Sequence, residues 1–195
     1  MEDLSKNLSE TAILEVGARL LAQNGYHRVT LEMLANQFGV TRQAIYYYYR
    51  SKEQLLEAIY ESAMIGLLHD WDVILTEDKL PLVKFTEALR AFIRRVLGQP
   101  TAVLVLNTLE RELDEPFYQM QRKRWHEYLL KLRILYNAAC DQGQVLPIDP
   151  HIAVYSLIGA VLSLPQWYRP SGNLTPEDIE HQIMGLLERG YVRFA

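Results

Sequence analysis

Apolar residues recur at helical spacing through most of the chain, and short polar or glycine-containing segments interrupt the repeats. These repeats predict nine helices, at residues 9–24, 31–38, 40–48, 51–71, 82–97, 101–113, 116–143, 150–165 and 176–191. Thr30 and Asp149 are suitable N-terminal caps, and Gly25 and Gly39 are suitable C-terminal ones. Because no segment reads convincingly as a strand, the sequence predicts an all-α protein.

The second and third of these helices are short, and Gly39 joins them by a tight turn. In the third helix, Val40, Ala44, Ile45 and Tyr48 form the inner face. The residues left to face outward are Thr41, Arg42, Gln43, Tyr46 and Tyr47. Two short helices with a glycine turn form a helix-turn-helix, whose second helix lies in the DNA major groove.

Four consecutive tyrosines, Tyr46 to Tyr49, follow Arg42 and Gln43 and precede Arg50 and Lys52. Tyrosine combines an apolar ring with a hydroxyl group, while Arg and Lys bring phosphate-seeking charge. Lys52 stands at the start of the next helix, whose free amides also attract a phosphate. The stretch therefore suits a surface that binds a polyanion.

Residues 30–52 resemble the signature of the TetR family of bacterial transcriptional regulators. The matching pieces are Thr30-Leu31, Leu34-Ala35, Gly39-Val40-Thr41, Ile45-Tyr46 with the tyrosines behind it, Ser51-Lys52-Glu53 and Leu55-Leu56. The resemblance implies a nine-helix TetR-like fold, with a three-helix DNA-binding head at residues 1–52 and an effector-binding and dimerisation domain at residues 53–195.

The resemblance also implies the function: a homodimeric, ligand-responsive DNA-binding transcriptional regulator, most often a repressor, that binds a palindromic operator. The residues expected to contact DNA are Thr30, Thr41, Arg42, Gln43, Tyr46, Tyr47 and Lys52. Thr41, Arg42 and Gln43 are expected to face base edges, and the others phosphates. Many family members carry a small residue in place of Gln43 and His in place of Tyr47, so the operator sequence stays open.

The net charge of -4 argues at first against a nucleic-acid partner, because DNA-binding domains are usually basic. The charge is unevenly distributed, however. Between residues 19 and 52 the only acidic residue is Glu32, and the basic residues there are Arg19, Arg28, Arg42, Arg50 and Lys52. The predicted head is thus the basic end of the chain.

The single Cys140 cannot form an intrachain disulfide, which favours a reducing compartment. The first ten residues are polar and partly acidic, unlike a secretory signal. The uncharged stretch at residues 152–166 is shorter than a membrane span and contains Pro165. The sequence therefore predicts a soluble cytoplasmic protein without a membrane partner.

The helix at 150–165 is apolar on nearly every face, so it must be covered on more than one side. With the last helix it can build a two-fold four-helix bundle. In proteins that resemble this one, the last two helices form the homodimer. Packing within a single chain is the alternative interpretation.

The segment Trp167-Tyr168-Arg169-Pro170, with Leu174 to Glu177 and residues 186–190, is similar to the end of a TetR subgroup that often senses acyl-coenzyme A thioesters. By that resemblance Arg169 pairs with a phosphate and Trp167 stacks on an adenine. Trp125, Leu129 and Tyr155 would line the site of the acyl chain. The alternative is that these aromatic residues are ordinary core.

The sequence contains no glycine-rich phosphate loop, HExxH motif or CxxC pair, and its five histidines are scattered. We therefore predict no catalytic residue, no metal site and no cofactor. Two rival functions remain open: a helical protein-interaction module whose tyrosines contact another protein, and a small-ligand enzyme on an all-helical scaffold.

Overall fold

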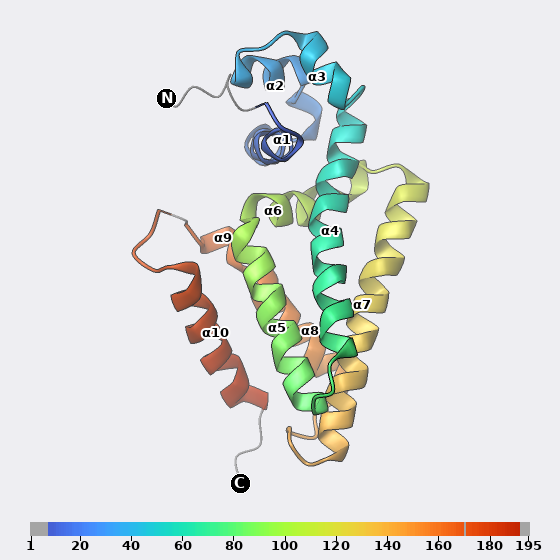
Figure 1. The fold of residues 1–195 in the computed structure, drawn as a ribbon, viewed down its shortest axis with the longest axis vertical. Coiled ribbons are helices and arrows are strands. Elements are labelled where there is room, and N and C mark those ends of the chain that lie inside the picture. Colours follow the sequence, from blue (N-terminus) through green and yellow to red (C-terminus); the bar gives the residue numbers. More distant parts are fainter. Residues whose placement is uncertain (1–7, 170, 192–195) are drawn as a thin grey trace. The chain divides into compact units, whose positions relative to one another are not determined.

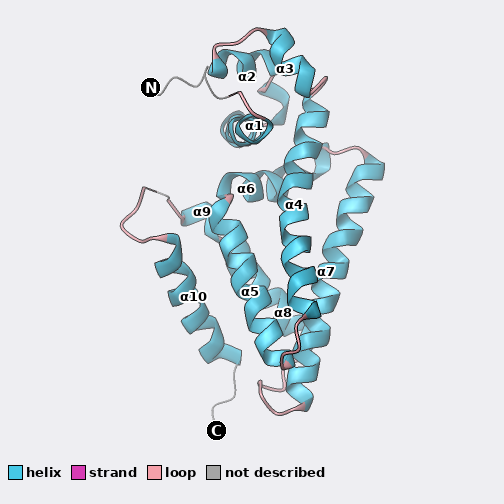
Figure 2. Cartoon of the chain, viewed as in Figure 1, coloured by secondary structure: helices cyan, strands magenta, loops and turns pink. Residues whose placement is uncertain are grey.

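The computed structural model describes residues 8–169 and 171–191, and within that part every regular element is a helix (Figure 2). The helices, labelled in Figure 1, are α1 (Glu10–Asn24), α2 (Leu31–Phe38), α3 (Arg42–Tyr48), α4 (Lys52–Thr76), α5 (Pro81–Gly98), α6 (Pro100–Leu109), α7 (Glu115–Asp141), α8 (Pro150–Leu162), α9 (Leu164–Trp167) and α10 (Pro176–Tyr191), with 3-10 turns at Tyr26–Arg28 and Glu110–Glu112. The all-α prediction is confirmed. The nine predicted helices correspond to α1–α8 and α10.

The short helix α9 was not predicted, and it exists because of a proline. Continuing α8 would place the Pro165 ring against the carbonyl of Val161. The structure instead ends α8 at Leu162, and Pro165 occupies the first turn of the four-residue α9, where a missing N–H costs nothing. The prediction of one continuous helix over residues 150–165 was wrong at its end for this reason. Among the described residues, no helix has the length and apolarity of a membrane span.

The chain forms two compact units, and the first holds Met1–Met64 together with Thr101–Met120. Its core joins Ile13, Leu34 and Ile45 of the first three helices, all fully buried, to Val105 of α6. The Tyr60 hydroxyl donates to the Leu106 carbonyl oxygen. Unit 1 is therefore larger than the predicted head at residues 1–52, because part of α4, α6 and the start of α7 pack into the same core.

Unit 2 holds Ile65–Pro100 and Gln121–Ala195, and α5 is its central helix. Phe85, Leu89 and Ile93 of α5 are fully buried, and α8, α9 and α10 all contact α5. Arg95 of α5 donates two hydrogen bonds to Asp70 of α4, at 2.7 and 2.8 Å. Charged contacts as well as apolar burial thus hold α5 in place.

Candidate nucleic-acid interface

The angle between α2 and α3 is set by a cap at each end of α2. The Thr30 hydroxyl accepts a hydrogen bond from the Met33 N–H at 3.2 Å, which satisfies one free amide of the first turn. At the other end Gly39 has φ 64° and ψ 28°, the left-handed conformation that glycine adopts without a steric cost. Both caps were predicted. The helix-turn-helix consists of α2, the turn at Gly39 and α3.

Helix α3 presents a buried face and an exposed face. Ile45 is fully buried and Tyr49, just after the helix, is nearly so. Thr41, Arg42 and Gln43 are exposed at its N-terminus. Tyr47 is 85% exposed, more than any other large hydrophobic side chain described. The predicted outward face is thus present, except that Tyr46 is half-buried.

Arg42 is held along the surface of α3 by its neighbour one turn later. Its guanidinium lies 4.7 Å from the centroid of the Tyr46 ring and donates a hydrogen bond to the Tyr46 hydroxyl. Planar guanidinium groups stack on aromatic faces in this way and keep further N–H donors for another partner. Arg42 is therefore partly ordered before any DNA arrives.

Lys52 has partners within the protein that the sequence did not reveal. Its Nζ donates to the Tyr26 carbonyl oxygen at 3.0 Å and lies 4.1 Å from the centroid of the Tyr26 ring. The Tyr26 hydroxyl donates to Glu53 Oε1 at 2.7 Å. Tyr26 and Glu53, 27 positions apart, were missed as positioning residues because helical periodicity carries no signal over that separation. Contact of Lys52 with a phosphate stays a prediction.

The same contacts change the acidity of the groups involved. Burial, followed by the hydrogen bond to Glu53, raises the pKa of Tyr26. The hydrogen bond from Ser51, followed by that from Tyr26, lowers the pKa of Glu53. The Ser51 hydroxyl also accepts from the Gln54 N–H at 3.3 Å, while Gln54 Oε1 accepts from the Arg50 N–H at 2.9 Å. The start of α4 is thus firmly tied to unit 1.

Tyr49 follows α3, and its hydroxyl group reaches α1. It donates to Glu10 Oε1 of α1 at 3.2 Å. Burial, with the nearby Glu10 carboxylate second, raises the pKa of Tyr49 to about 12. The hydroxyl group therefore stays protonated at neutral pH and links the end of α3 to α1.

The five predicted effector residues differ in burial within unit 2. Leu129 is buried and Trp125 half-buried on α7, whereas Tyr155 is 41% and Trp167 is 54% exposed. Arg169 is exposed and donates to the Tyr168 carbonyl oxygen at 3.0 Å. Pro170 of the same motif lies outside the described residues. A single effector site made of all five residues stays a prediction.

Trp125 instead belongs to an aromatic cluster inside unit 2. Its ring stacks on Tyr128, with centroids 5.5 Å apart and an interplanar angle of 9°, and the Tyr128 ring lies 5.4 Å from that of Trp71. Phe92 of α5 completes the cluster, 5.9 Å from Trp125. These residues come from α4, α5 and α7.

Two polar atoms in this cluster are buried without a hydrogen-bond partner among the described residues, Trp71 Nε1 and the Tyr128 hydroxyl oxygen. Such a group costs about 1–3 kcal/mol when it stays unpaired. Burial raises the pKa of Tyr128, so its hydroxyl group remains a neutral donor. Helical periodicity could not reveal this pair, because Trp71 and Tyr128 lie on different helices and look like ordinary core positions.

No group of three or more His, Cys, Asp or Glu side chains in the described part of the chain is arranged to hold a metal ion. The interface therefore has to be understood from its hydrogen-bond donors, rings and charges. This all-helical protein contains a helix-turn-helix whose second helix is exposed and polar. These features are typical of helix-turn-helix DNA-binding proteins.

Comparison with known proteins identifies the family. The model of the "Bacterial regulatory proteins, tetR family" matches residues 13–59, and that of the "Tetracyclin repressor-like, C-terminal domain" matches residues 78–191. The chain belongs to the TetR family of bacterial transcriptional regulators. The expectation that it is not an enzyme is confirmed by this membership.

Three relatives illustrate the likeness. The HTH-type transcriptional repressor KstR2 of Mycolicibacterium smegmatis is 22% identical over 186 residues, which cover 91% of this chain and 88% of the relative. A TetR/AcrR-family regulator from Thermobifida fusca is 32% identical, with a TM-score of 0.70 over 94% of this chain and 98% of the other. AibR, solved with isovaleryl coenzyme A and operator DNA, is 27% identical, with a TM-score of 0.76 over 90% and 96%.

Proposed function

We propose that this protein is a homodimeric transcriptional repressor that leaves a palindromic operator when a small apolar or acyl-coenzyme A-type effector binds to unit 2. The single observation that carries the DNA-binding part is the outer face of α3, where Arg42, Gln43 and Tyr47 are exposed on a helix whose other face is buried. A protein that reads DNA acts in the cytoplasm of a bacterium, so we propose that location too.

The proposed roles along α3 follow from chemistry. Arg42 binds guanine O6 and N7, and Gln43 pairs with adenine N6 and N7, with Thr41 beside them at base edges. Tyr46, Tyr47, Lys52 and the α2 start at Thr30 contact phosphates. Lys52 reaches a phosphate by giving up its hydrogen bond to the Tyr26 carbonyl oxygen. The base contacts carry specificity, whereas the phosphate contacts carry affinity and salt dependence.

The exposed face of α8 supports the dimer. It presents Ile152, Tyr155, Ser156, Gly159 and Ala160 at spacings of three and four residues, which place them on one side of the helix. The last three residues of this stripe, Ser156, Gly159 and Ala160, are small and allow close helix packing. A two-fold dimer through α8 and α10 would carry two copies of α3. Two copies are needed to bind two half-sites about 34–36 Å apart.

The aromatic cluster of unit 2 supports the effector proposal. AibR, a relative of similar fold, was solved with isovaleryl coenzyme A, and a thioester carbonyl oxygen accepts hydrogen bonds. Trp71 Nε1 and the Tyr128 hydroxyl are unpaired donors in apolar surroundings, suited to such an oxygen. Because α4 contributes residues to both units, an effector that prefers one position of α4 would change the spacing of the two heads, with a coupling of about 1–3 kcal/mol.

A gel-shift experiment with the DNA beside its own gene tests the proposal. We expect retention of that fragment over a scrambled one, with an affinity that falls steeply as salt rises. Calorimetry with acyl-coenzyme A esters and the free acids should find one that binds and releases the DNA. If no DNA is retained at low salt, the rival function, a helical protein-interaction module, replaces this one. DNA retention without any effector response would remove only the effector part.

A further inference from the structure

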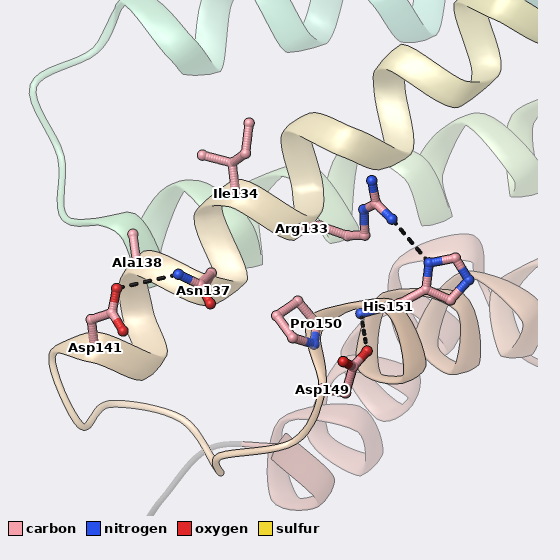
Figure 3. A pocket seen from close by; sticks show the side chains of 8 residues that line it. All are labelled: Arg133, Ile134, Asn137, Ala138, Asp141, Asp149, Pro150 and His151. Carbon is pink, nitrogen blue, oxygen red and sulfur yellow. Dashed lines mark hydrogen bonds between the residues drawn. The ribbon is translucent and has the colours of Figure 1, made fainter.

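An open pocket of about 490 Å³ lies between the second half of α7 and the start of α8, within unit 2 (Figure 3). Its volume is in the usual range of small-molecule sites. We call it the α7–α8 pocket. None of its lining residues belongs to the aromatic cluster proposed to bind the effector, so it is a separate site. The lining residues are Arg133, Ile134, Asn137, Ala138 and Asp141 of α7, with Asp149, Pro150 and His151 at the start of α8.

The charged side chains of the α7–α8 pocket are separated along α7. Arg133 and Asp141 are eight positions apart, which corresponds to about 12 Å along the helix axis. Figure 3 shows Arg133 beside His151 at one end of the pocket and Asp141 beside Asn137 at the other, with Pro150 between them. The pocket therefore has a basic end and an acidic end with an apolar residue between them.

At the basic end, Arg133 keeps hydrogen-bond donors for a ligand. Its Nη1 lies 2.9 Å from His151 Nδ1, and because a guanidinium group can only donate, Nδ1 is the acceptor. This contact uses one of several N–H groups. The His151 ring is held in turn by stacking on Tyr155, with centroids 4.2 Å apart. Among the described residues no carboxylate forms an ion pair with Arg133, so its charge is available to a ligand.

At the acidic end, Asp141 is the carboxylate available to a ligand. It is exposed, and its Oδ2 accepts a hydrogen bond from Asn137 Nδ2 at 3.2 Å. No basic side chain in the described part of the chain forms an ion pair with it. Asp149 is used differently, because its Oδ1 accepts from the backbone N–H groups of His151 at 2.8 Å and Ile152 at 3.2 Å and so caps α8.

We propose that the α7–α8 pocket binds a small zwitterion whose carboxylate and ammonium groups are separated by a short apolar chain. The carboxylate pairs with Arg133 and the ammonium group with Asp141. A ligand with only a negative charge would leave Asp141 unpaired and meet the carboxylate of Asp149, and a ligand with only a positive charge would leave Arg133 unpaired. Both charges are therefore needed to complement the two ends.

The spacing of the two ends sets the length of the ligand. Hydrogen bonds of about 3 Å at both ends, taken from the separation of about 12 Å, leave about 6 Å between the charged groups of the ligand. An ω-amino acid with a chain of five or six carbons has such a separation. The inference goes beyond the proposed function, because it concerns neither the DNA nor the effector that releases it.

Titration of the full chain with 6-aminohexanoate, followed by amide NMR shifts, tests this inference. Hexanoate and hexylamine are the matched comparisons, because each carries one of the two charges on a chain of the same length. We expect shifts at the residues of the α7–α8 pocket and an affinity about fivefold higher than that of either comparison, since each partly exposed ion pair contributes up to about 1 kcal/mol. The shorter 4-aminobutanoate should bind more weakly, because it cannot reach both ends.

Two variants assign the ends of the ligand. Arg133→Gln and Asp141→Asn should each lower the affinity for 6-aminohexanoate about fivefold. Arg133→Gln should also weaken hexanoate but not hexylamine, and Asp141→Asn should do the reverse. Lys123→Gln and Glu127→Gln make the same changes of charge at exposed sites of α7 outside the pocket, so they should bind like the wild type.

The possible failures are distinct. Hexanoate or hexylamine binding as tightly as 6-aminohexanoate would overturn the zwitterion, and equal affinities in the pocket variants and their controls would overturn the assignment to this pocket. No shift from any of the compounds up to tens of millimolar would remove the site altogether. None of these results bears on DNA retention in the gel-shift experiment, so the proposed function stands or falls separately.

Discussion

Two regions of the molecule are rich in charged and polar groups: the outer face of α3 in unit 1, and the contact between α5 and α10 in unit 2. They differ in where the partners of these groups lie in the sequence. On α3, Arg42 is supported by Tyr46, four positions away on the same helix. Between α5 and α10, Glu180 is bonded to Arg94 at 2.6 and 2.9 Å across 86 positions of sequence. The first arrangement leaves donors available to a partner, and the second uses them to fix a helix.

This difference has a consequence for mutation. Replacing an exposed residue of α3 such as Arg42 removes only a contact made within α3 itself, so binding should change while stability changes little. Replacing a residue of the α5–α10 contact removes bonds that the fold itself uses. The four predictions below test that separation, starting with the largest effect.

The largest loss of stability in either unit is expected from replacing a buried phenylalanine. Phe38 of unit 1 is 1% and Phe85 of unit 2 is 0% exposed. Phe38→Ala and Phe85→Ala should each lower the free energy of unfolding by about 3–5 kcal/mol, the usual cost of such a cavity. Urea denaturation measures the loss, and hydrogen exchange shows which unit loses protection. Equal loss of protection in both units from either variant would mean that the two units unfold together and would weaken the comparison.

Arg42→Ala should lower operator affinity about ten- to a hundredfold and relax base preference, because the proposed contact of Arg42 with a base edge is lost. The melting temperature should stay the same. Lys52→Ala is the matched comparison: we expect weaker binding to all sequences and a salt slope smaller by about one unit. It should also lower stability, because Lys52 is bonded to Tyr26. Titrations with operator and scrambled DNA at several salt concentrations measure both variants. An equal loss of base preference in the two would contradict the assigned roles.

Glu180→Gln should lower the free energy of unfolding by about 1–2 kcal/mol. The value is moderate because the Arg94 side chain is 66% exposed and water screens the ion pair. The hydrogen bond from Arg94 lowers the pKa of Glu180 below its ordinary 4.5. A lowered folded-state pKa gives stability that is present above about 4.5 and is lost as the pH falls through the folded value.

The difference in unfolding free energy between the wild type and Glu180→Gln should therefore shrink below pH 4.5. Denaturation at a series of pH values and hydrogen exchange along α10 measure it. Glu177→Gln, on the same helix and exposed, serves as the control. A difference that stays constant down to pH 3 would show that the charge of Glu180 contributes nothing to the contact.

The sequence was sufficient for features that are decided within a few residues. Thr30 and Gly39 cap α2 because a hydroxyl three positions before an amide and a glycine after a helix act locally. The exposed face of α3 followed from helical spacing alone. Periodicity says nothing about partners such as Tyr26 for Lys52 or Arg94 for Glu180, because they meet only after the chain has folded.

The smallest predicted effect concerns the link between α3 and α1. Tyr49→Phe removes the hydrogen bond to Glu10 and should cost about 0.5–1.5 kcal/mol at pH 8, with operator preference unchanged. The pKa of Tyr49 is raised from 10.0 to about 12 in the folded protein, so its contribution is complete below pH 10 and is lost as the pH rises toward 12. The gap in unfolding free energy between the wild type and Tyr49→Phe should therefore narrow above pH 10, while the other tyrosines cancel in the comparison. Urea denaturation at pH 8, 10 and 11 measures it, and a gap that widened with pH would show that the Tyr49 phenol is more acidic in the folded protein than in the unfolded chain.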